Sequence, residues 1–148
     1  MRALSLSQPW ASVVVHGPKR IENRPLSLAG GAGKLVGHTI AVHAAKSWDA
    51  DAVAFIAYSA PSYTPPDHAR GALIGTARLV EVLTFRDLEA GRVKIAADQI
   101  RWAFGPLCIV LDQVAAIPTP IPCRGMLGFW TLPADLEAQL ATQLEARK

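Results

Sequence analysis

Two absences in this sequence each exclude a class of protein. Among 148 residues there are only two cysteines, Cys108 and Cys123, which is too few for a disulfide framework and too widely spaced for a zinc-binding pair. The histidines have no zinc-ligand spacing either. No segment approaches the roughly 20 apolar residues that a membrane span needs. We therefore expect no metal, no cofactor and no membrane partner.

The chain also lacks repeats and low-complexity segments, and its first residues lack the apolar stretch of a secretory signal. We expect a cytoplasmic protein. Glycines are dense in residues 26–37, but no Gly-Lys-Ser/Thr follows them, so this segment is predicted to be a loop that does not cradle phosphate. The hydrophobic fraction of 51% is enough for a sizeable core, and the length predicts a single domain over residues 1–148.

Alternation of apolar and polar residues, helical spacing and the Gly/Pro stop signals predict an α+β fold. Gly75 lies inside a long apolar strand and suggests a bend or bulge there. This favours a small mixed β-barrel, partly closed, with flanking short helices. The predicted helices lie near residues 8–16, 48–59 and 134–146, and the predicted strands near residues 3–7, 20–24, 39–44, 71–85, 104–114 and 127–132.

Positive charge gathers in the first third of the chain. Residues 1–46 hold six basic residues and one acid, a balance of +5, so within the total of +3 the remaining residues carry −2. A basic half is typical of proteins that bind a polyanion such as nucleic acid. A chance asymmetry on a solvated surface explains the same numbers, so charge alone leaves both interpretations open.

Residues 17–24 read Gly-x-Lys-x-x-Glu-x-Arg and place three charged groups, Lys19, Glu22 and Arg24, in an otherwise apolar region. A Lys/Arg pair can hold phosphate, and an acceptor between the two cations can read a base. The alternative is a structural cluster of ion pairs. Because exposed pairs contribute only about 0–1 kcal/mol, stability is a weak reason to place three charges here.

This motif is part of a longer resemblance to the ASCH domain family of the PUA-like superfamily. The resemblance implies a small barrel with a cleft for single-stranded or structured RNA, or for a nucleotide-sized ligand. It covers nearly the whole chain in order, through residues 4–11, 17–24, 40–46, 71–75, 102–106 and 122–125, with Trp130.

The resemblance also implies which residues face the cleft. Lys19, Glu22 and Arg24 match the family's cleft motif, and Lys19 and Glu22 would be the catalytic pair if the chain is an enzyme. Other candidates for nucleic-acid binding are Ser5, Gln8, Trp10, His43, Lys46, Trp102 and Arg124.

Several of these candidates have an equally ordinary structural interpretation. Trp10 lies on the apolar stripe of a helix, where core packing is the commoner role, whereas Trp102 precedes a Gly-Pro turn and is expected to be a partly exposed stacking platform. His43 lies in an apolar strand, where a histidine is usually buried with its hydrogen bonds satisfied. Arg124 either holds a phosphate or solvates a turn.

Three functions follow from these residues. The first is a nucleic-acid-binding domain, most simply for RNA, in which a positive groove combines with stacking faces. Ribonuclease activity would add Glu22 or His43 as a general base and Lys19 and Arg24 as a phosphate clamp. The alternative is a small amidohydrolase acting on an acylated nucleoside such as N4-acetylcytidine, whose family motif has a threonine nucleophile where this chain has Glu22, with Glu81 as a further carboxylate.

Overall fold

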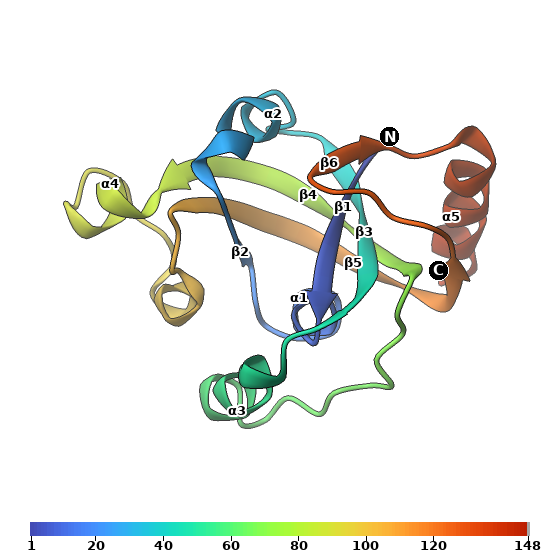
Figure 1. The fold of residues 1–148 in the computed structure, drawn as a ribbon, viewed down its shortest axis with the longest axis horizontal. Helices are drawn as coiled ribbons and strands as arrows, with labels where there is room; N and C mark the ends of the chain where they lie inside the picture. The colour runs from blue at the N-terminus through green and yellow to red at the C-terminus, as the bar shows by residue number, and fades with distance from the viewer. Residues whose placement is uncertain (148) are drawn as a thin grey trace. The chain divides into compact units, whose positions relative to one another are not determined.

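Helices and strands are interspersed along residues 1–147, the part of the chain that this computed structural model describes (Figure 1). The strands are β1 (Arg2–Gln8), β2 (Ile21–Arg24), β3 (Thr39–Trp48), β4 (Ala72–Thr84), β5 (Leu107–Pro122) and β6 (Phe129–Thr131). The α-helices are α1 (Trp10–Val15), α2 (Ala29–Gly33), α3 (Ala50–Ser59), α4 (Phe85–Glu89) and α5 (Ala134–Ala146). Two 3₁₀ turns, η1 (Leu26–Leu28) and η2 (Ala97–Trp102), complete the described elements.

The predicted α+β class and the three main helices are confirmed. Helices α1, α3 and α5 fall within the segments predicted near residues 8–16, 48–59 and 134–146. Asp49 caps the N-terminus of α3. Ser47 belongs to β3, and the side chain of Asp49 accepts the backbone N–H of Asp51 at 3.2 Å. No helix in residues 1–147 combines the length and apolar character needed to cross a membrane.

The predicted barrel is wrong, because the strands form an open mixed sheet. Their hydrogen-bonded order is β2–β5–β4–β3–β1–β6, and β2 and β6 stand at its two ends without pairing with each other. β1 runs parallel to β3 and antiparallel to β6, and β2 runs antiparallel to β5. Closure requires the first and last strands of the order to bond to each other, and the sequence pattern carries no information on that pairing.

The described chain divides into two compact units. The first unit combines residues 1–18 and 39–77 with the residues from 113 onward, and the second combines residues 19–38 with residues 78–112. Strands β4 and β5 run through both units. The single domain expected from the sequence stays a prediction.

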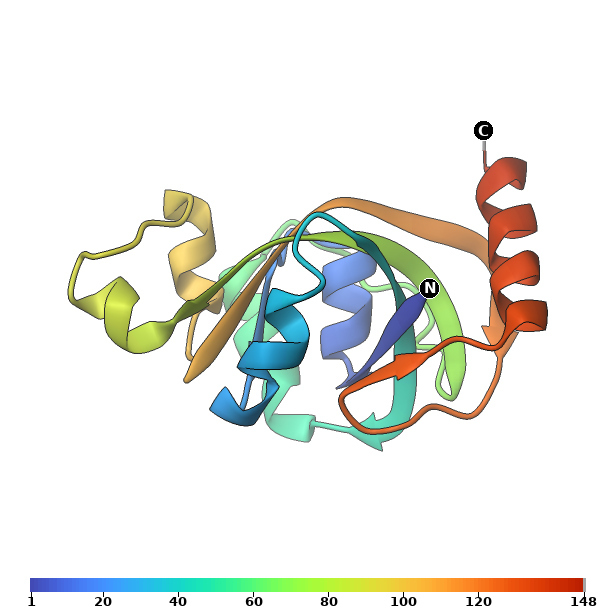
Figure 2. The same ribbon diagram turned by 90° about the horizontal axis from the view of Figure 1, so that it is seen from above.

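The core of the first unit joins the sheet to the C-terminal helix. Leu140 of α5 is fully buried in a cluster with Ile117 and Ile121 of β5 and Trp130 of β6. Leu136 and Leu144 pack against the same cluster, so a stripe of leucines is the face that α5 buries. Figure 2 shows α5 beside the end of β5, with the short strand β6 leading into it.

The segment predicted as a glycine-rich loop is partly helical. Residues 26–33 form η1 and the one-turn helix α2, which holds three glycines. Glycine disfavours a helix by about 1 kcal/mol relative to alanine, but Ala32 of this turn is fully buried. Burial of this methyl group is a tertiary contribution that local propensity does not contain.

The proline-rich end of β5 lies where a sheet tolerates proline. β2 pairs only with Leu107–Val110 of β5, so Pro118, Pro120 and Pro122 lie beyond the reach of β2. A strand with a neighbour on one side only does not need every backbone N–H, so it tolerates proline.

Gly75 lies in β4 where another strand comes very close. A Cβ atom at this position would lie 2.4 Å from the carbonyl oxygen of Ala115 and 2.9 Å from the Val15 side chain. The backbone oxygen cannot retreat without disturbing β5. Close approach of the two strands therefore requires glycine here.

We expect Gly75→Ala to lower the free energy of unfolding by about 1–3 kcal/mol, the usual cost of overpacking a core. Urea denaturation measures the change. The control is Gly30→Ala in α2, where a Cβ atom would meet nothing within 4 Å. That variant should be neutral, or stabilised by up to about 1 kcal/mol. Equal stabilities for the two variants would contradict the close-approach explanation.

Candidate functional site

One candidate site of the first unit is a cavity of about 1420 Å³, which we call the main cavity. Its walls come from β1, β3 and β6, from the turn that precedes β4, and from the segment after β5. The residues that line it are Ser5, His43, Ala45, Lys46, Arg70, Gly71, Pro122, Cys123, Arg124, Gly125, Met126, Leu127, Trp130, Thr131 and Pro133.

Strand register places a serine beside a histidine in the wall of this cavity. In the parallel β1–β3 pair, Ser5 lies opposite His43, and their side chains meet with Ser5 Oγ 3.0 Å from His43 Nδ1. β6 pairs with the other edge of β1, and its Trp130 donates from Nε1 to Ser5 Oγ at 3.1 Å. The two strand pairings thus converge on one hydroxyl group.

The hydrogen bonds of His43 define its proton arrangement. Nε2 lies 2.9 Å from the carbonyl oxygen of Cys123, and a carbonyl oxygen can only accept. In the neutral ring Nε2 therefore carries the proton, and Nδ1 accepts from the Ser5 hydroxyl. Burial lowers the pKa of His43, while its bond to the Cys123 carbonyl acts in the opposite direction. The neutral base is accordingly the form that the fold favours.

Gly125, which also lines the cavity, packs closely against the Ser5–His43 pair. A Cβ atom on Gly125 would lie 2.4 Å from His43 Cε1, 2.5 Å from Nδ1 and 2.6 Å from Ser5 Oγ. Any side chain here would push the histidine and the serine apart. The Cys123–Gly125 segment therefore supplies both the acceptor for Nε2 and the close packing on the pair.

Three cations stand around the same cavity. Lys46, Arg70 and Arg124 are all exposed, and none of them forms an ion pair with a carboxylate of residues 1–147. The stem of Lys46 passes over Gly71, where a Cβ atom would lie 3.1 Å from Lys46 Cε and where φ is +65°. Both the contact and the left-handed backbone favour glycine at 71. No acidic residue lines the cavity, so its field favours an anion.

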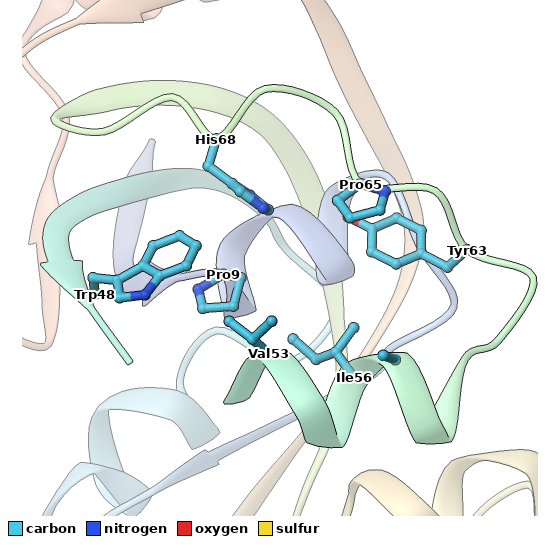
Figure 3. A pocket seen from close by; sticks show the side chains of 8 residues that line it. Pro9, Trp48, Val53, Ile56, Tyr63, Pro65 and His68 are labelled. Atoms are coloured by element: carbon cyan, nitrogen blue, oxygen red, sulfur yellow. The ribbon is translucent and has the colours of Figure 1, made fainter. Parts of the chain in front are cut away.

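A second, smaller pocket of about 170 Å³ lies in the same unit and is nearly all apolar (Figure 3). Figure 3 shows the rings of Trp48, His68 and Tyr63 around it, with Val53 and Ile56 of α3 on one side. Burial raises the pKa of Tyr63 to about 12, and its hydroxyl finds no hydrogen-bond partner among the described residues. Arg70 Cζ lies 4.9 Å from the centre of the Trp48 ring, so one side chain of the main cavity also touches a wall of this apolar pocket.

The motif Gly-x-Lys-x-x-Glu-x-Arg forms a charge cluster in the second unit. Glu22 Oε1 lies 3.2 Å from Lys19 Nζ, and Glu22 Oε2 lies 2.9 Å from Arg24 Nε. Lys19 is only 2% exposed and also donates to the backbone oxygen of Ile21. Burial is the largest influence on Lys19 and lowers its pKa, and Glu22 partly offsets this. The expected position of Glu22 between two cations is observed. The predicted ligand-binding role of the three residues stays a prediction.

The expected exposure of one side chain is wrong, and a second side chain is already hydrogen-bonded within the protein. Trp102 is 1% exposed, so it is not the partly exposed stacking platform that the sequence predicted. Gln8 is fully buried, and both ends of its amide are bonded within the protein, Nε2 to the Ala69 oxygen at 2.8 Å and Oε1 to the Ser12 N–H at 3.0 Å. These two bonds hold Gln8 at the start of α1, and its predicted role in nucleic-acid binding stays a prediction.

Trp10 has the packing role that was considered for it and also forms a hydrogen bond. Its ring packs against Phe55 at 6.1 Å between centroids, which is the packing role, and Nε1 donates to Asp49 Oδ2 at 2.9 Å. The ring is half-buried. Its predicted stacking role stays a prediction.

The structure gathers only some of the predicted residues into one site. Ser5, His43, Lys46 and Arg124 line the main cavity, whereas Lys19, Glu22, Arg24 and Trp102 belong to the second unit. Sequence reasoning missed Arg70, Trp48 and the acceptor role of the Cys123 carbonyl. The arginine next to a glycine before β4 was the available signal for Arg70. Residues 1–147 contain no group of three His, Cys, Asp or Glu side chains arranged to hold a metal.

Comparison with known proteins shows a similar fold among solved structures. No family model matches the chain, and no curated protein matches it. A solved structure of the ASCH protein from Zymomonas mobilis is similar, with a TM-score of 0.54, 18% identity and coverage of 95% of this chain and 93% of that one. The structure of a tyrosine-to-phenylalanine mutant of that protein has a TM-score of 0.54 and 18% identity, with coverage of 95% of this chain and 96% of that one. A serine-to-alanine mutant has a TM-score of 0.52 and 17% identity, with coverage of 95% and 94%.

We expect Glu22→Gln to destabilise the protein by about 3–5 kcal/mol, because removing one partner of a buried ion pair leaves the other charge uncompensated. Urea denaturation gives the free energy of unfolding. The control is Asp112→Asn, which breaks a half-exposed pair with Arg78 at 2.7 Å. That change should cost less than about 1 kcal/mol. If Glu22→Gln costs no more than Asp112→Asn, the cluster is not a structural one.

We also expect the protein to lose stability as the pH falls below about 6.5, the ordinary pKa of histidine. Burial is the largest cause that lowers the pKa values of His16, His43 and His68 in the folded protein, so the unfolded chain binds more protons below that pH. Stability should be fully present above pH 6.5 and should decline toward the lowered pKa values.

Urea denaturation at pH 7.5 and pH 5.5 measures this loss. His43→Gln should reduce the difference between the two pH values, and exposed His38→Gln should leave it unchanged. A pH dependence that His38→Gln removes and His43→Gln preserves would show that other groups are responsible.

Proposed function

We propose that this chain, which has the fold of the ASCH protein from Zymomonas mobilis, binds RNA or another single-stranded nucleic acid through the main cavity. One observation carries the proposal: Lys46, Arg70 and Arg124 surround one cavity and have no carboxylate partner in residues 1–147. Cations that stabilise a fold usually have acidic partners within the protein. For cations that bind phosphate, the ligand itself supplies the negative charge.

The surroundings of these cations fit a nucleotide chain. Arg70 stacks on Trp48, whose side chain is 38% exposed and offers a flat face beside a charge. Met126 and Leu127 also line the main cavity, and both are exposed apolar side chains. Proteins that bind single strands combine a positive groove with aromatic or apolar faces on which bases stack. A nucleotide-sized ligand uses the same groups.

Lys19 and Arg24 are a weaker basis for the proposal than the sequence indicated. Lys19 is buried and paired, so a phosphate would have to displace Glu22 to reach it. The three cations of the main cavity need no such exchange. We therefore base the binding proposal on Lys46, Arg70 and Arg124, and the role of the Gly-x-Lys motif in binding remains a prediction from the resemblance.

We expect binding of a fluorescently labelled single-stranded RNA to weaken as salt rises. Three phosphate contacts predict a slope of about −2 for log affinity against log salt, because each contact on a single strand contributes about −0.7. The triple variant K46Q/R70Q/R124Q should bind at least about 10-fold more weakly and show a flatter slope. Fluorescence anisotropy at four salt concentrations measures both quantities.

The matched control is K34Q/R86Q/K94Q, which removes three exposed cations of the second unit and changes the net charge equally. This control should bind nearly as well as the unsubstituted protein. Equal losses in the two triple variants would mean that net charge alone attracts the RNA. Gel analysis of the RNA recovered from the same samples shows whether it is bound intact or cleaved.

A further inference from the structure

The main cavity contains a hydroxyl group and a base in direct contact. Ser5 Oγ donates to His43 Nδ1 at 3.0 Å, and His43 Nε2–H is held by the Cys123 carbonyl at 2.9 Å. A nucleophile bonded to a base that is itself oriented by a third group is the arrangement that activates serine for covalent catalysis. Here a backbone carbonyl takes the orienting place.

The surroundings of Ser5 also suit the charge that would develop on its oxygen. Trp130 Nε1 donates to Ser5 Oγ at 3.1 Å, which stabilises negative charge on that oxygen as its proton leaves. The Cys123 carbonyl favours the protonated ring of His43 and opposes the effect of burial. Ser5 lines the cavity and is half-buried, so its oxygen borders the space that a ligand would occupy.

From this geometry we propose that Ser5 is the nucleophile and His43 the general base of an acyl-transfer site that hydrolyses an ester or amide. The anionic, nucleotide-like character of the rest of the substrate rests on the proposed function, since Lys46, Arg70 and Arg124 line the same cavity.

The reaction proceeds in two balanced halves. Ser5 Oγ attacks the acyl carbon while its proton passes to His43 Nδ1, and the bond between the acyl carbon and the leaving oxygen or nitrogen breaks. The leaving group takes the proton from His43. Water then attacks the acyl-serine, gives one proton through His43 Nδ1 to Ser5 Oγ, and releases the carboxylic acid. The cations around the cavity lower the energy of the oxyanion in both halves.

The same geometry favours this reaction over direct deprotonation of a ribose hydroxyl by His43. Nδ1 already accepts from Ser5, and Nε2 is engaged by the Cys123 carbonyl. A ribose 2′-OH would have to displace Ser5 to reach the base. Ser5 itself needs no displacement.

The experiment uses two small neutral probes that need no anion site. A fluorophosphonate traps an activated serine irreversibly, as the oxygen attacks phosphorus, fluoride leaves and the proton goes to the base. p-Nitrophenyl acetate reports acyl transfer by release of p-nitrophenolate. We expect one fluorophosphonate adduct per chain, located on Ser5 by peptide mass spectrometry, and measurable hydrolysis of the acetate ester.

Variants separate the proposed chemistry from incidental labelling. Ser5→Ala should remove the adduct, and His43→Gln should slow both reactions by about 10²–10⁴-fold, the usual contribution of a general base. Gly125→Ala should slow them too, because its methyl group would separate the pair. The control is Ser7→Ala on the same strand, since Ser7 Oγ bonds to Ser47 Oγ at 2.8 Å and has no bond to a histidine in residues 1–147. It should react like the unsubstituted protein.

Circular dichroism confirms folding of each variant, and Ser5→Thr, which keeps the hydroxyl, should retain part of the labelling if Ser5→Ala unfolds. No adduct on Ser5 in the folded unsubstituted protein, or an adduct found instead on Cys123 or a lysine, overturns the proposal. The RNA-binding measurement is independent of the labelling and ester-hydrolysis measurements, because the two probes are neutral. Loss of anisotropy in K46Q/R70Q/R124Q with intact labelling of Ser5 supports both proposals, and labelling of Ser5 without any RNA binding removes only the binding proposal.

Discussion

The parallel register between β1 and β3 is the constraint on which the candidate site depends. It sets Ser5 opposite His43, and a shift of one residue would turn one of the two side chains to the other face of the sheet. The antiparallel pairing of β6 with the other edge of β1 then brings Trp130 to the same hydroxyl. Three strands that are distant in sequence thus determine one hydrogen-bond network, and apolar packing around Trp130 and Leu140 holds them in place.

Polar groups in the two units satisfy burial in different ways. In the second unit, Lys19 is buried, and its amino group contacts the Glu22 carboxylate and a backbone oxygen. In the first unit, His43 is equally buried, but its neutral ring is satisfied by one hydroxyl and one carbonyl. A buried charge needs a counter-charge, whereas a neutral ring needs only a donor and an acceptor. The neutral arrangement leaves a base that can still accept a proton.

The cations of the main cavity and the Ser5–His43 pair have different properties within the first unit. Lys46, Arg70 and Arg124 are exposed and supply charge, while Ser5 and His43 are held in the wall and supply proton chemistry. Gly71 and Gly125 make this arrangement possible, because a side chain at either position would collide with the lysine stem or with the Ser5–His43 pair. The proposed binding and the proposed acyl transfer therefore use different atoms of one cavity.

The sequence by itself determined the α+β class and the three main helices, because hydrophobic periodicity and Gly/Pro stop signals are local properties. It did not determine that the sheet stays open, that Trp102 is buried or that the charges around Glu22 pair with one another, since these depend on which distant segments pack together. The partners of His43 show the difference most clearly. Its burial was expected from its apolar strand, but Ser5 and the Cys123 carbonyl lie 38 and 80 residues away in the sequence. Strand register sets Ser5 against Nδ1, and the path of the chain after β5 brings the Cys123 carbonyl to Nε2; both are tertiary properties.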